Sequence, residues 1–168
     1  MREAWRAMRP LAGDPADAGF VVQRNAAPGV PVAVRATEDP LFGPVLSFGI
    51  SGAATELLGD YAFRIPPLSR SEATAMVRDI KAAPLLFGYR GSEPVDTGAV
   101  ERLLMAVAQL KDDLPQVQEL WLELVVVGGK GEGATVLTAS ARVQPATPTR
   151  SDSFARRMPV PVGDTASG

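Results

Sequence analysis

The sequence contains neither cysteine nor histidine. Without cysteine, the chain cannot form disulfides, thiolate metal sites or a thiol nucleophile. Without histidine, it lacks the most common general base, the most common transition-metal ligand and any residue that could become a phosphohistidine. Cysteine- and histidine-dependent chemistry on this chain is therefore excluded.

Strong charge of one sign and long apolar runs are also missing. The net charge is −2, with both signs scattered, so there is no basic footprint of the kind that nucleic-acid-binding proteins carry. No apolar run reaches the roughly eighteen residues that cross a bilayer. Arg2, Glu3, Arg6 and Arg9 interrupt the only candidate signal sequence. We expect a cytoplasmic protein that binds neither nucleic acid nor membrane.

Hydrophobic residues make up 46% of the 168 residues, which is enough for one domain with a single core. Trp5, Met8 and Leu11 have helical spacing and predict an N-terminal helix within residues 1–14. This helix is either frayed or the remainder of a longer element. Residues 15–145 should form the domain, and the Pro-, Ser- and Gly-containing residues 146–168 a flexible tail.

Period-two patterns bounded by turn residues predict a series of strands. The expected strands are Phe20–Gln23, Val30–Thr37, Val45–Ile50, Tyr61–Ile65, Glu119–Val127 and Thr135–Val143. The last two flank the Gly-rich loop Gly128–Gly133 and should pair as an antiparallel hairpin. Pro31 cannot donate a ladder hydrogen bond, so its strand should lie at an edge of the sheet or begin there.

Two amphipathic helices and one short helical turn lie between these strands. Ser69 and Glu72 have the spacing of a capping box, and the apolar residues that follow are Ala73, Met76, Val77 and Ile80. Asp96 or Thr97 should cap the second helix, whose stripe is Val100, Leu103, Leu104, Val107 and Leu110. A helical turn over residues 53–58 should end at Gly59. Both stripes predict helices packed on a sheet.

Three motifs could carry chemistry. The segment Gly49-Ile50-Ser51-Gly52 could bring backbone N–H groups to a phosphate or could be a structural turn, and no Gly-Lys-Ser/Thr follows it as in a Walker loop. The loop Gly128–Gly133 contains a lysine but precedes a strand, so it is a hairpin loop. Glu119 and Glu123 share one face of a strand, where they could serve metal or acid–base chemistry or simply face solvent.

An ordered series of segments resembles the C-terminal half of the ATP-grasp domain of NDP-forming acyl-CoA synthetases, the acetate–CoA ligase family. The segments are Phe20-Val21-Val22-Gln23-Arg24, Pro28-Gly29-Val30, Asp39-Pro40-Leu41-Phe42-Gly43-Pro44-Val45, Glu56-Leu57-Leu58-Gly59-Asp60, Ala62-Phe63-Arg64, Pro67-Leu68, Leu86-Phe87-Gly88-Tyr89-Arg90-Gly91 and the final hairpin. The same module occurs in actinobacterial proteins that fuse an acetyltransferase to an acyl-CoA-synthetase-like region.

The resemblance implies a fold and a ligand set. The fold is α+β, a C-terminal ATP-grasp subdomain with a mainly antiparallel sheet and helices packed on one face. The implied cofactors are ATP or ADP with Mg²⁺. Val22 and Gln23 correspond to the adenine-side strand, Gly49 and Gly52 to a phosphate-side loop, and Glu123 to a metal position.

The sequence departs from the family pattern at several chemical positions. The front half of the family's ATP clamp, with its phosphate-contacting lysine, has no counterpart here. The family's Asp-Leu-Asn-Pro run, whose Asn ligates Mg²⁺, appears as Trp121-Leu122-Glu123-Leu124. Ser140 replaces the Asp that precedes Ala-Arg in the last strand, and Pro31 replaces a Glu.

Two functions follow as hypotheses. In the first, the chain is a partial ATP-grasp domain that contributes the back wall of an ATP/Mg site and is not active alone. Its partners would be the missing N-terminal ATP-grasp half and CoA-binding domains, in cis or in trans. In the second, it is a degenerate, non-catalytic domain with a structural or regulatory contact role beside an acetyltransferase or CoA-binding domain. No residue is assigned a catalytic role in either.

Overall fold

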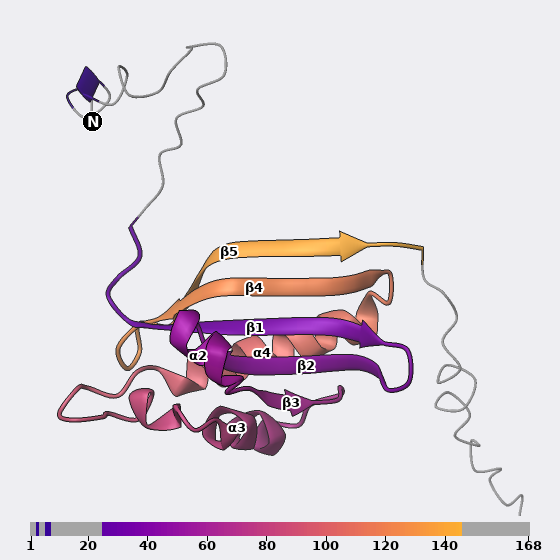
Figure 1. Ribbon diagram of the computed structural model, residues 1–168, viewed down its shortest axis with the longest axis horizontal. Helices are drawn as coiled ribbons and strands as arrows, with labels where there is room; N and C mark the ends of the chain where they lie inside the picture. Colours follow the sequence, from indigo (N-terminus) through magenta and orange to yellow (C-terminus); the bar gives the residue numbers. More distant parts are fainter. Residues whose placement is uncertain (1–2, 4–5, 8–24, 146–168) are drawn as a thin grey trace, which may run out of the picture.

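A five-stranded antiparallel sheet forms the centre of the computed structural model, which describes residues 3, 6–7 and 25–145 (Figure 1). The strands are β1 (Val30–Asp39), β2 (Gly43–Ile50), β3 (Ala62–Arg64), β4 (Val117–Val127) and β5 (Ala134–Val143). Their order across the sheet is β3-β2-β1-β4-β5, and every neighbouring pair is antiparallel. The predicted α+β class with a mainly antiparallel sheet is confirmed.

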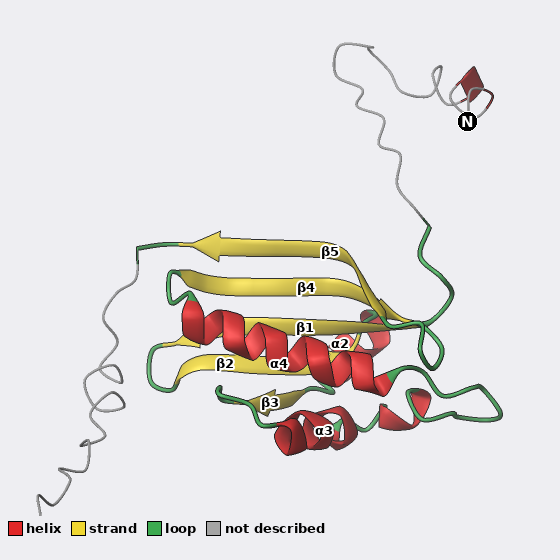
Figure 2. Ribbon diagram, turned by 180° about the vertical axis from the view of Figure 1, so that it is seen from behind, coloured by secondary structure: helices red, strands yellow, loops and turns green. Residues whose placement is uncertain are grey.

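The helices lie on both sides of this sheet. The helices α3 (Arg70–Asp79) and α4 (Thr97–Asp113) pack on one face, as predicted, and the 3-10 turn η2 (Ala83–Leu85) follows α3. The short helix α2 (Ala53–Leu58) lies on the opposite side, as the front and back views show (Figures 1 and 2). We call the face under α3 and α4 the inner face and the opposite one the outer face. No helix in the part of the chain that the structure describes is long and apolar enough to span a membrane.

Both predicted helix caps are present. The Ser69 hydroxyl accepts from the Glu72 backbone N–H at 3.3 Å, and the Glu72 carboxylate accepts from the Ser69 backbone N–H at 2.8 Å. These hydrogen bonds from the Ser69 hydroxyl and backbone stabilise the charged carboxylate, so they hold the pKa of Glu72 below its ordinary value. Asp96 caps α4 by accepting from the Ala99 N–H at 2.9 Å. The two helices that cover the inner face therefore begin where the sequence indicates.

Strand β1 lies at the centre of the sheet, with β2 on one side and β4 on the other. Pro31 is the second residue of this strand. The alternative that Pro31 marks an edge strand is therefore wrong, and the alternative that the strand begins there is confirmed. Pro31 still takes part in the structure through its carbonyl, which accepts from the Ser51 N–H at 2.9 Å.

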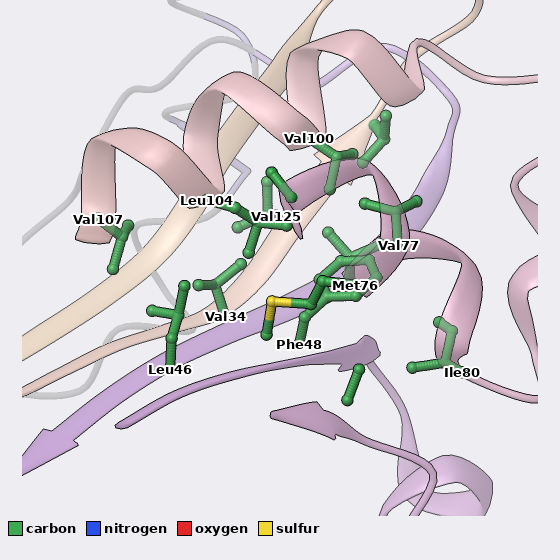
Figure 3. Packing of buried hydrophobic residues seen from close by; sticks show 14 of the residues in the cluster. Val34, Leu46, Phe48, Met76, Val77, Ile80, Val100, Leu104, Val107 and Val125 are labelled. Carbon is green, nitrogen blue, oxygen red and sulfur yellow. The ribbon is translucent and has the colours of Figure 1, made fainter. Parts of the chain in front are cut away.

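The core lies between the inner face and helices α3 and α4 (Figure 3). Its fully buried large side chains are Leu46, Phe48, Met76, Leu86, Leu104, Val32, Val34, Val77, Val100, Val125 and Val127. Met76 and Val77 of α3 and Val100, Leu104 and Val107 of α4 belong to the stripes predicted from the sequence. Burial of these apolar surfaces is the main favourable term for this fold.

Strand β5 forms one edge of the sheet and is the least covered strand. Among the described strands it pairs only with β4. Apart from Ala134, every one of its side chains is exposed, including Val136, Leu137 and Val143. The predicted strand Phe20–Gln23, the tail 146–168 and Trp5, Met8 and Leu11 of the predicted N-terminal helix all lie outside the described residues.

Candidate functional site on the outer face of the sheet

A row of side chains crosses the outer face at the middle of the sheet. Strand register pairs Phe63 with Ser47, Ser47 with Arg35, Arg35 with Trp121 and Trp121 with Ser140. Their neighbours Leu46 and Phe48 on β2 and Val34 and Ala36 on β1 are buried in the core. Because side chains alternate along a strand, this row faces away from the core. We call these five residues the outer row.

Arg35 is the charged centre of the outer row. Its guanidinium carbon lies 5.2 Å from the centre of the Trp121 ring and 5.9 Å from that of Tyr61. Both distances fall within the range of cation–π attraction. Glu56 of α2 lies 3.6 Å away, and the Arg35 side chain remains 33% exposed. The two rings therefore hold a guanidinium that can still be reached from solvent.

Two N–H donors in the outer row have no acceptor within the described part of the chain. The Nε of Arg35 and the Nε1 of Trp121 are both buried, and neither has a hydrogen-bond partner among the described residues. A buried donor without an acceptor costs about 1–3 kcal/mol. These donors come from directly paired residues of β1 and β4. The outer row thus has fewer paired hydrogen-bond donors than is expected of a surface whose side chains only stabilise the fold.

The glycines of the predicted phosphate-side loop border this row. Gly49 lies within β2, and a Cβ on it would lie 2.8 Å from both the Asp60 carbonyl oxygen and the Tyr61 ring. Gly49 therefore has a packing role that is independent of any ligand. Gly52 has a φ of 139°, a conformation that favours glycine. Its carbonyl accepts from the Glu56 N–H at 3.0 Å, which begins α2.

Glu123 lies at a bulge in β4. Between the pairs Val32–Val125 and Val34–Leu122, β4 contains one more residue than β1. The side chain of Glu123 is exposed. Its carbonyl accepts from the Ser51 hydroxyl at 3.0 Å, a contact between positions 72 residues apart. The fold thus brings the Gly49–Gly52 segment beside Glu123.

Glu119 and Ser140 lie at the β5 side of the outer row. Glu119 forms an ion pair with Arg142 of β5. An open hollow of about 200 Å³ lies here and is lined by Glu119, Trp121, Ser140, Ala141 and Arg142. The two acids predicted to share a face are therefore in different surroundings, since Glu119 is ion-paired and Glu123 is exposed.

A metal ion finds few ligands on this face. The described residues contain no cluster of three or more Asp, Glu, His or Cys side chains that could hold a metal. Mg²⁺ prefers octahedral oxygen ligands, usually including one or two carboxylates. Of the two positions that the resemblance assigns to acidic or metal-binding residues, one carries Glu123 and the other carries Ser140, which is not a carboxylate. The charge at the centre of the outer row is that of the cation Arg35. The described residues do not fit a protein-held Mg²⁺.

The sequence predicts part of this site. It identified Gly49, Gly52 and Glu123, which the fold brings to one region, and Val22 and Gln23, which lie outside the described residues. It did not assign a role to Arg35, Tyr61 or Trp121. The alternation in residues 30–37 places Arg35 on the face opposite Val32 and Val34. Trp121 is recognisable in the sequence because it replaces the first Asp of the Asp-Leu-Asn-Pro run. Their meeting depends on the register between β1 and β4.

Three comparisons show what the chain is similar to. The family model described as an ATP-grasp domain matches residues 1–143. The β subunit of acetate–CoA ligase [ADP-forming] II from Pyrococcus furiosus is 42% identical over 122 residues, covering 72% of this chain and 52% of the relative. The 4-hydroxybutyrate–CoA ligase [ADP-forming] of Nitrosopumilus maritimus is 35% identical over 99 residues, covering 59% and 14% respectively.

A solved structure has the same fold. Acetyl-coenzyme A synthetase 1 from Ca. Korarchaeum cryptofilum, in complex with coenzyme A and Mg-AMPPCP, superposes with a TM-score of 0.72 at 33% identity. The match covers 85% of this chain and 62% of the solved chain. This chain therefore spans about half the length of the β subunit and less than two thirds of the solved chain.

Proposed function

This chain belongs to the ATP-grasp family, among the ADP-forming acetate–CoA ligase-like proteins, and we propose that it forms the back wall of a composite nucleotide site. One observation carries the proposal. Two segments that the family resemblance assigns to phosphate and metal, Gly49–Gly52 and Glu123, lie together on the open outer face. They are joined by the Ser51–Glu123 hydrogen bond although they are distant in sequence.

In this proposal the wall needs a second half. Residues 15–145 contribute the wall, and an N-terminal ATP-grasp half and CoA-binding domains complete the site, in cis or in trans. Val22 and Gln23 would contact the adenine side, Gly49 and Gly52 the phosphate side, and Glu123 would be this wall's ligand to any Mg²⁺ that arrives with the nucleotide. The metal's other ligands would come from the nucleotide and the second half. The wall alone is inactive, because the family's phosphate-contacting lysine lies in that half.

A chimera tests this role. The segment of the Pyrococcus furiosus β subunit that matches this chain is replaced by residues 15–145, and binding of ADP is measured by calorimetry. We expect the chimera to bind ADP more tightly than this chain alone does, because the upstream half closes the site. The matched control is the unmodified β subunit. A folded chimera that binds ADP no better than the single chain would contradict the composite site.

A second function has support from one specific contact. Trp121 occupies the position where the resemblance expects the first Asp of the Asp-Leu-Asn-Pro run. The Arg35 guanidinium lies over the ring of this tryptophan. This contact favours a degenerate ATP-grasp domain that serves as a structural or regulatory contact beside an acetyltransferase or CoA-binding domain. In that case the outer face need not bind nucleotide at all.

Restoring the family ligands separates the two functions. The double substitution Glu123→Asn and Ser140→Asp should raise the affinity for Mg-ADP if the rest of the pocket is functional. The same substitutions should leave the affinity for ADP in EDTA unchanged, which controls for effects that do not involve the metal. No gain in Mg-ADP affinity, with the fold intact by circular dichroism, would favour the degenerate domain.

A further inference from the structure

We propose that the outer row binds a phosphate oxyanion directly through Arg35, without a divalent cation. This inference rests on the proposed function, because it concerns the same wall of the same site. It replaces the metal expected from the family with a guanidinium that belongs to this chain. Trp121 and Ser140 are then part of the binding surface, so these two departures of the sequence from the family pattern acquire a single explanation.

The charge along the outer row is positive. Its five residues include one cation, Arg35, and no carboxylate. Ser47 and Trp121 flank Arg35 on the neighbouring strands, and Ser140 follows Trp121. All four side chains carry hydrogen-bond donors. A phosphate oxyanion accepts several hydrogen bonds at once, so such a row suits it better than it suits a metal ion.

Two N–H donors of the outer row are unused within the described part of the chain. The Nε of Arg35 and the Nε1 of Trp121 are buried, and neither finds an acceptor among the residues that the structure describes. Unpaired buried donors are rare in stable proteins, and each one calls for an explanation. A small rotation of each side chain, with the guanidinium still over the ring, would bring both donors to the rim of the stack, where one oxyanion would accept from both. The cost of leaving them unpaired in the free protein would then be recovered on binding.

Arg35 is held by two aromatic rings, and its charge is only weakly neutralised. Trp121 and Tyr61 lie 5.2 and 5.9 Å from its guanidinium carbon. Arg35 has one ion-pair partner in the described chain, Glu56, at 3.6 Å, and the Glu56 side chain is 58% exposed. Exposed pairs of this kind contribute little stability. An incoming phosphate can therefore displace Glu56 while the rings keep the guanidinium in place.

The acids around the row do not cancel its charge. Glu119 is paired with Arg142. Glu123 is exposed at the bulge, one alternation beyond Trp121, and its side chain can turn to solvent. Glu56 is the acid that competes for Arg35 itself. The structure therefore predicts that Glu56 weakens anion binding, which is a consequence that a purely structural Arg35 would not have.

Fluorescence of Trp121 gives a direct test on the full chain. The sequence has two tryptophans, Trp5 and Trp121, so Trp5→Phe leaves Trp121 as the single fluorophore. Inorganic pyrophosphate is titrated in EDTA, and the titration is repeated with ADP, with acetate and with added Mg²⁺. We expect saturable changes with pyrophosphate and ADP in EDTA, no tighter binding when Mg²⁺ is present, and no response to acetate.

Substitutions identify the residue that binds. Arg35→Gln should weaken pyrophosphate binding by about tenfold or more, because it removes a charge-assisted hydrogen bond. Glu56→Gln should strengthen it by about two- to threefold, because the competing carboxylate is gone. The matched control is Arg78→Gln, since Arg78 also lies over an aromatic ring, that of Phe87, at 5.2 Å. Arg78→Gln should leave the affinity unchanged.

If Arg35→Gln fails to fold, Arg35→Lys keeps the charge and the apolar stem but loses the planar fork. It should bind pyrophosphate more weakly than the parent chain while its thermal unfolding stays cooperative. Calorimetry in EDTA checks the fluorescence result independently. Together with Glu56→Gln, this variant keeps the proposal testable even if the stack of Arg35 and Trp121 is needed for folding.

Two outcomes would overturn the proposal. One is pyrophosphate binding that requires Mg²⁺ or is unaffected by the Arg35 and Glu56 substitutions. The other is the absence of any pyrophosphate response in the folded chain. The chimera described above separates this failure from that of the composite site. A chimera that binds ADP only with Mg²⁺ and independently of Arg35 would preserve the composite site and remove the metal-free oxyanion site.

Discussion

The two faces of the sheet treat their polar groups differently. On the inner side, Lys111 of α4 is fully buried, and its ammonium donates to the Glu38 carboxylate at 3.0 Å and to the carbonyls of Val117 and Gln118. Asp60 is also buried and accepts from the Lys81 and Ala82 N–H groups, both at 2.8 Å.

On the outer side, by contrast, the Nε of Arg35 and the Nε1 of Trp121 are buried and have no acceptor in the part of the chain that the structure describes. Buried polar groups stabilise a fold only when they are paired. The inner groups therefore hold the elements together, and the outer groups are what a binding surface would leave available. The difference between the faces separates residues that serve folding from residues that are candidates for function.

The largest expected effect is the loss of the buried lysine. Lys111→Met should lower the free energy of unfolding by about 3 kcal/mol, because Glu38 and two strand carbonyls lose their donor. Urea denaturation followed by circular dichroism measures this change. The exposed loop residue Lys130 offers the control, and Lys130→Met should change stability by less than about 0.5 kcal/mol. Equal effects of both substitutions would show that the buried contacts of Lys111 contribute no specific stability.

A smaller loss of stability is expected at Gly49 of β2, which packs against Asp60 and Tyr61. Gly49→Ala should cost about 2 kcal/mol, because the added methyl would lie 2.8 Å from a backbone oxygen that cannot easily move. Gly98→Ala in α4 is the control, since its Cβ would lie 3.4 Å from the flexible Arg102 side chain and alanine favours helix. Thermal unfolding of the two variants should shift in opposite directions. An unchanged unfolding temperature of Gly49→Ala would mean that Asp60 and Tyr61 move aside at little cost.

The capping box gives an effect of about 1 kcal/mol. Ser69→Ala should destabilise α3 by roughly that amount. It should also change the dependence of stability on pH, because Ser69 lowers the pKa of Glu72 in the folded state. The contribution of the charged Glu72 is present above its ordinary value of 4.5 and is lost as the pH falls through the lower folded value. Denaturation of the two proteins at pH 6 and pH 3 tests this: their stabilities should differ more at the higher pH.

The smallest effect on stability is expected at the outer row. Trp121→Phe keeps a ring beneath Arg35 but removes the unpaired Nε1–H, so stability should change by less than about 1 kcal/mol. Chemical denaturation measures it alongside Lys111→Met. A loss as large as that of Lys111→Met would show that Trp121 serves the fold, and the contrast between the faces would then fail.

The sequence predicts most of the fold because its signals are local. The capping residues Ser69 and Asp96, the apolar stripes of α3 and α4 and the hairpin of β4 and β5 each depend on neighbouring residues. The position of β1 at the centre of the sheet depends instead on long-range pairing, which is why Pro31 was compatible with an edge. The placement of α2 on the outer side has the same cause, since a six-residue helix carries little periodic signal.

The candidate site is less accessible from sequence than the fold. The resemblance directs attention to Glu123 and to Gly49 and Gly52, and the fold brings these residues together. The meeting of Arg35 and Trp121 requires the register between β1 and β4, which is shifted by the bulge at Glu123. Nothing within either strand alone predicts that shift. The contact between Arg35 and Trp121 exists only in the paired strands.

Strand β5 has a consequence for the protein in solution. It pairs on one side only among the described strands, and nearly all of its ten residues are exposed. An open strand edge carries a line of unused N–H and C=O groups that can pair with another extended chain. Arg142 is the one charged side chain along this strand, which gives little electrostatic protection against such pairing. As the concentration of the chain rises, self-association should therefore begin at β5, and the colloidal behaviour of the whole molecule will depend on what covers this one strand.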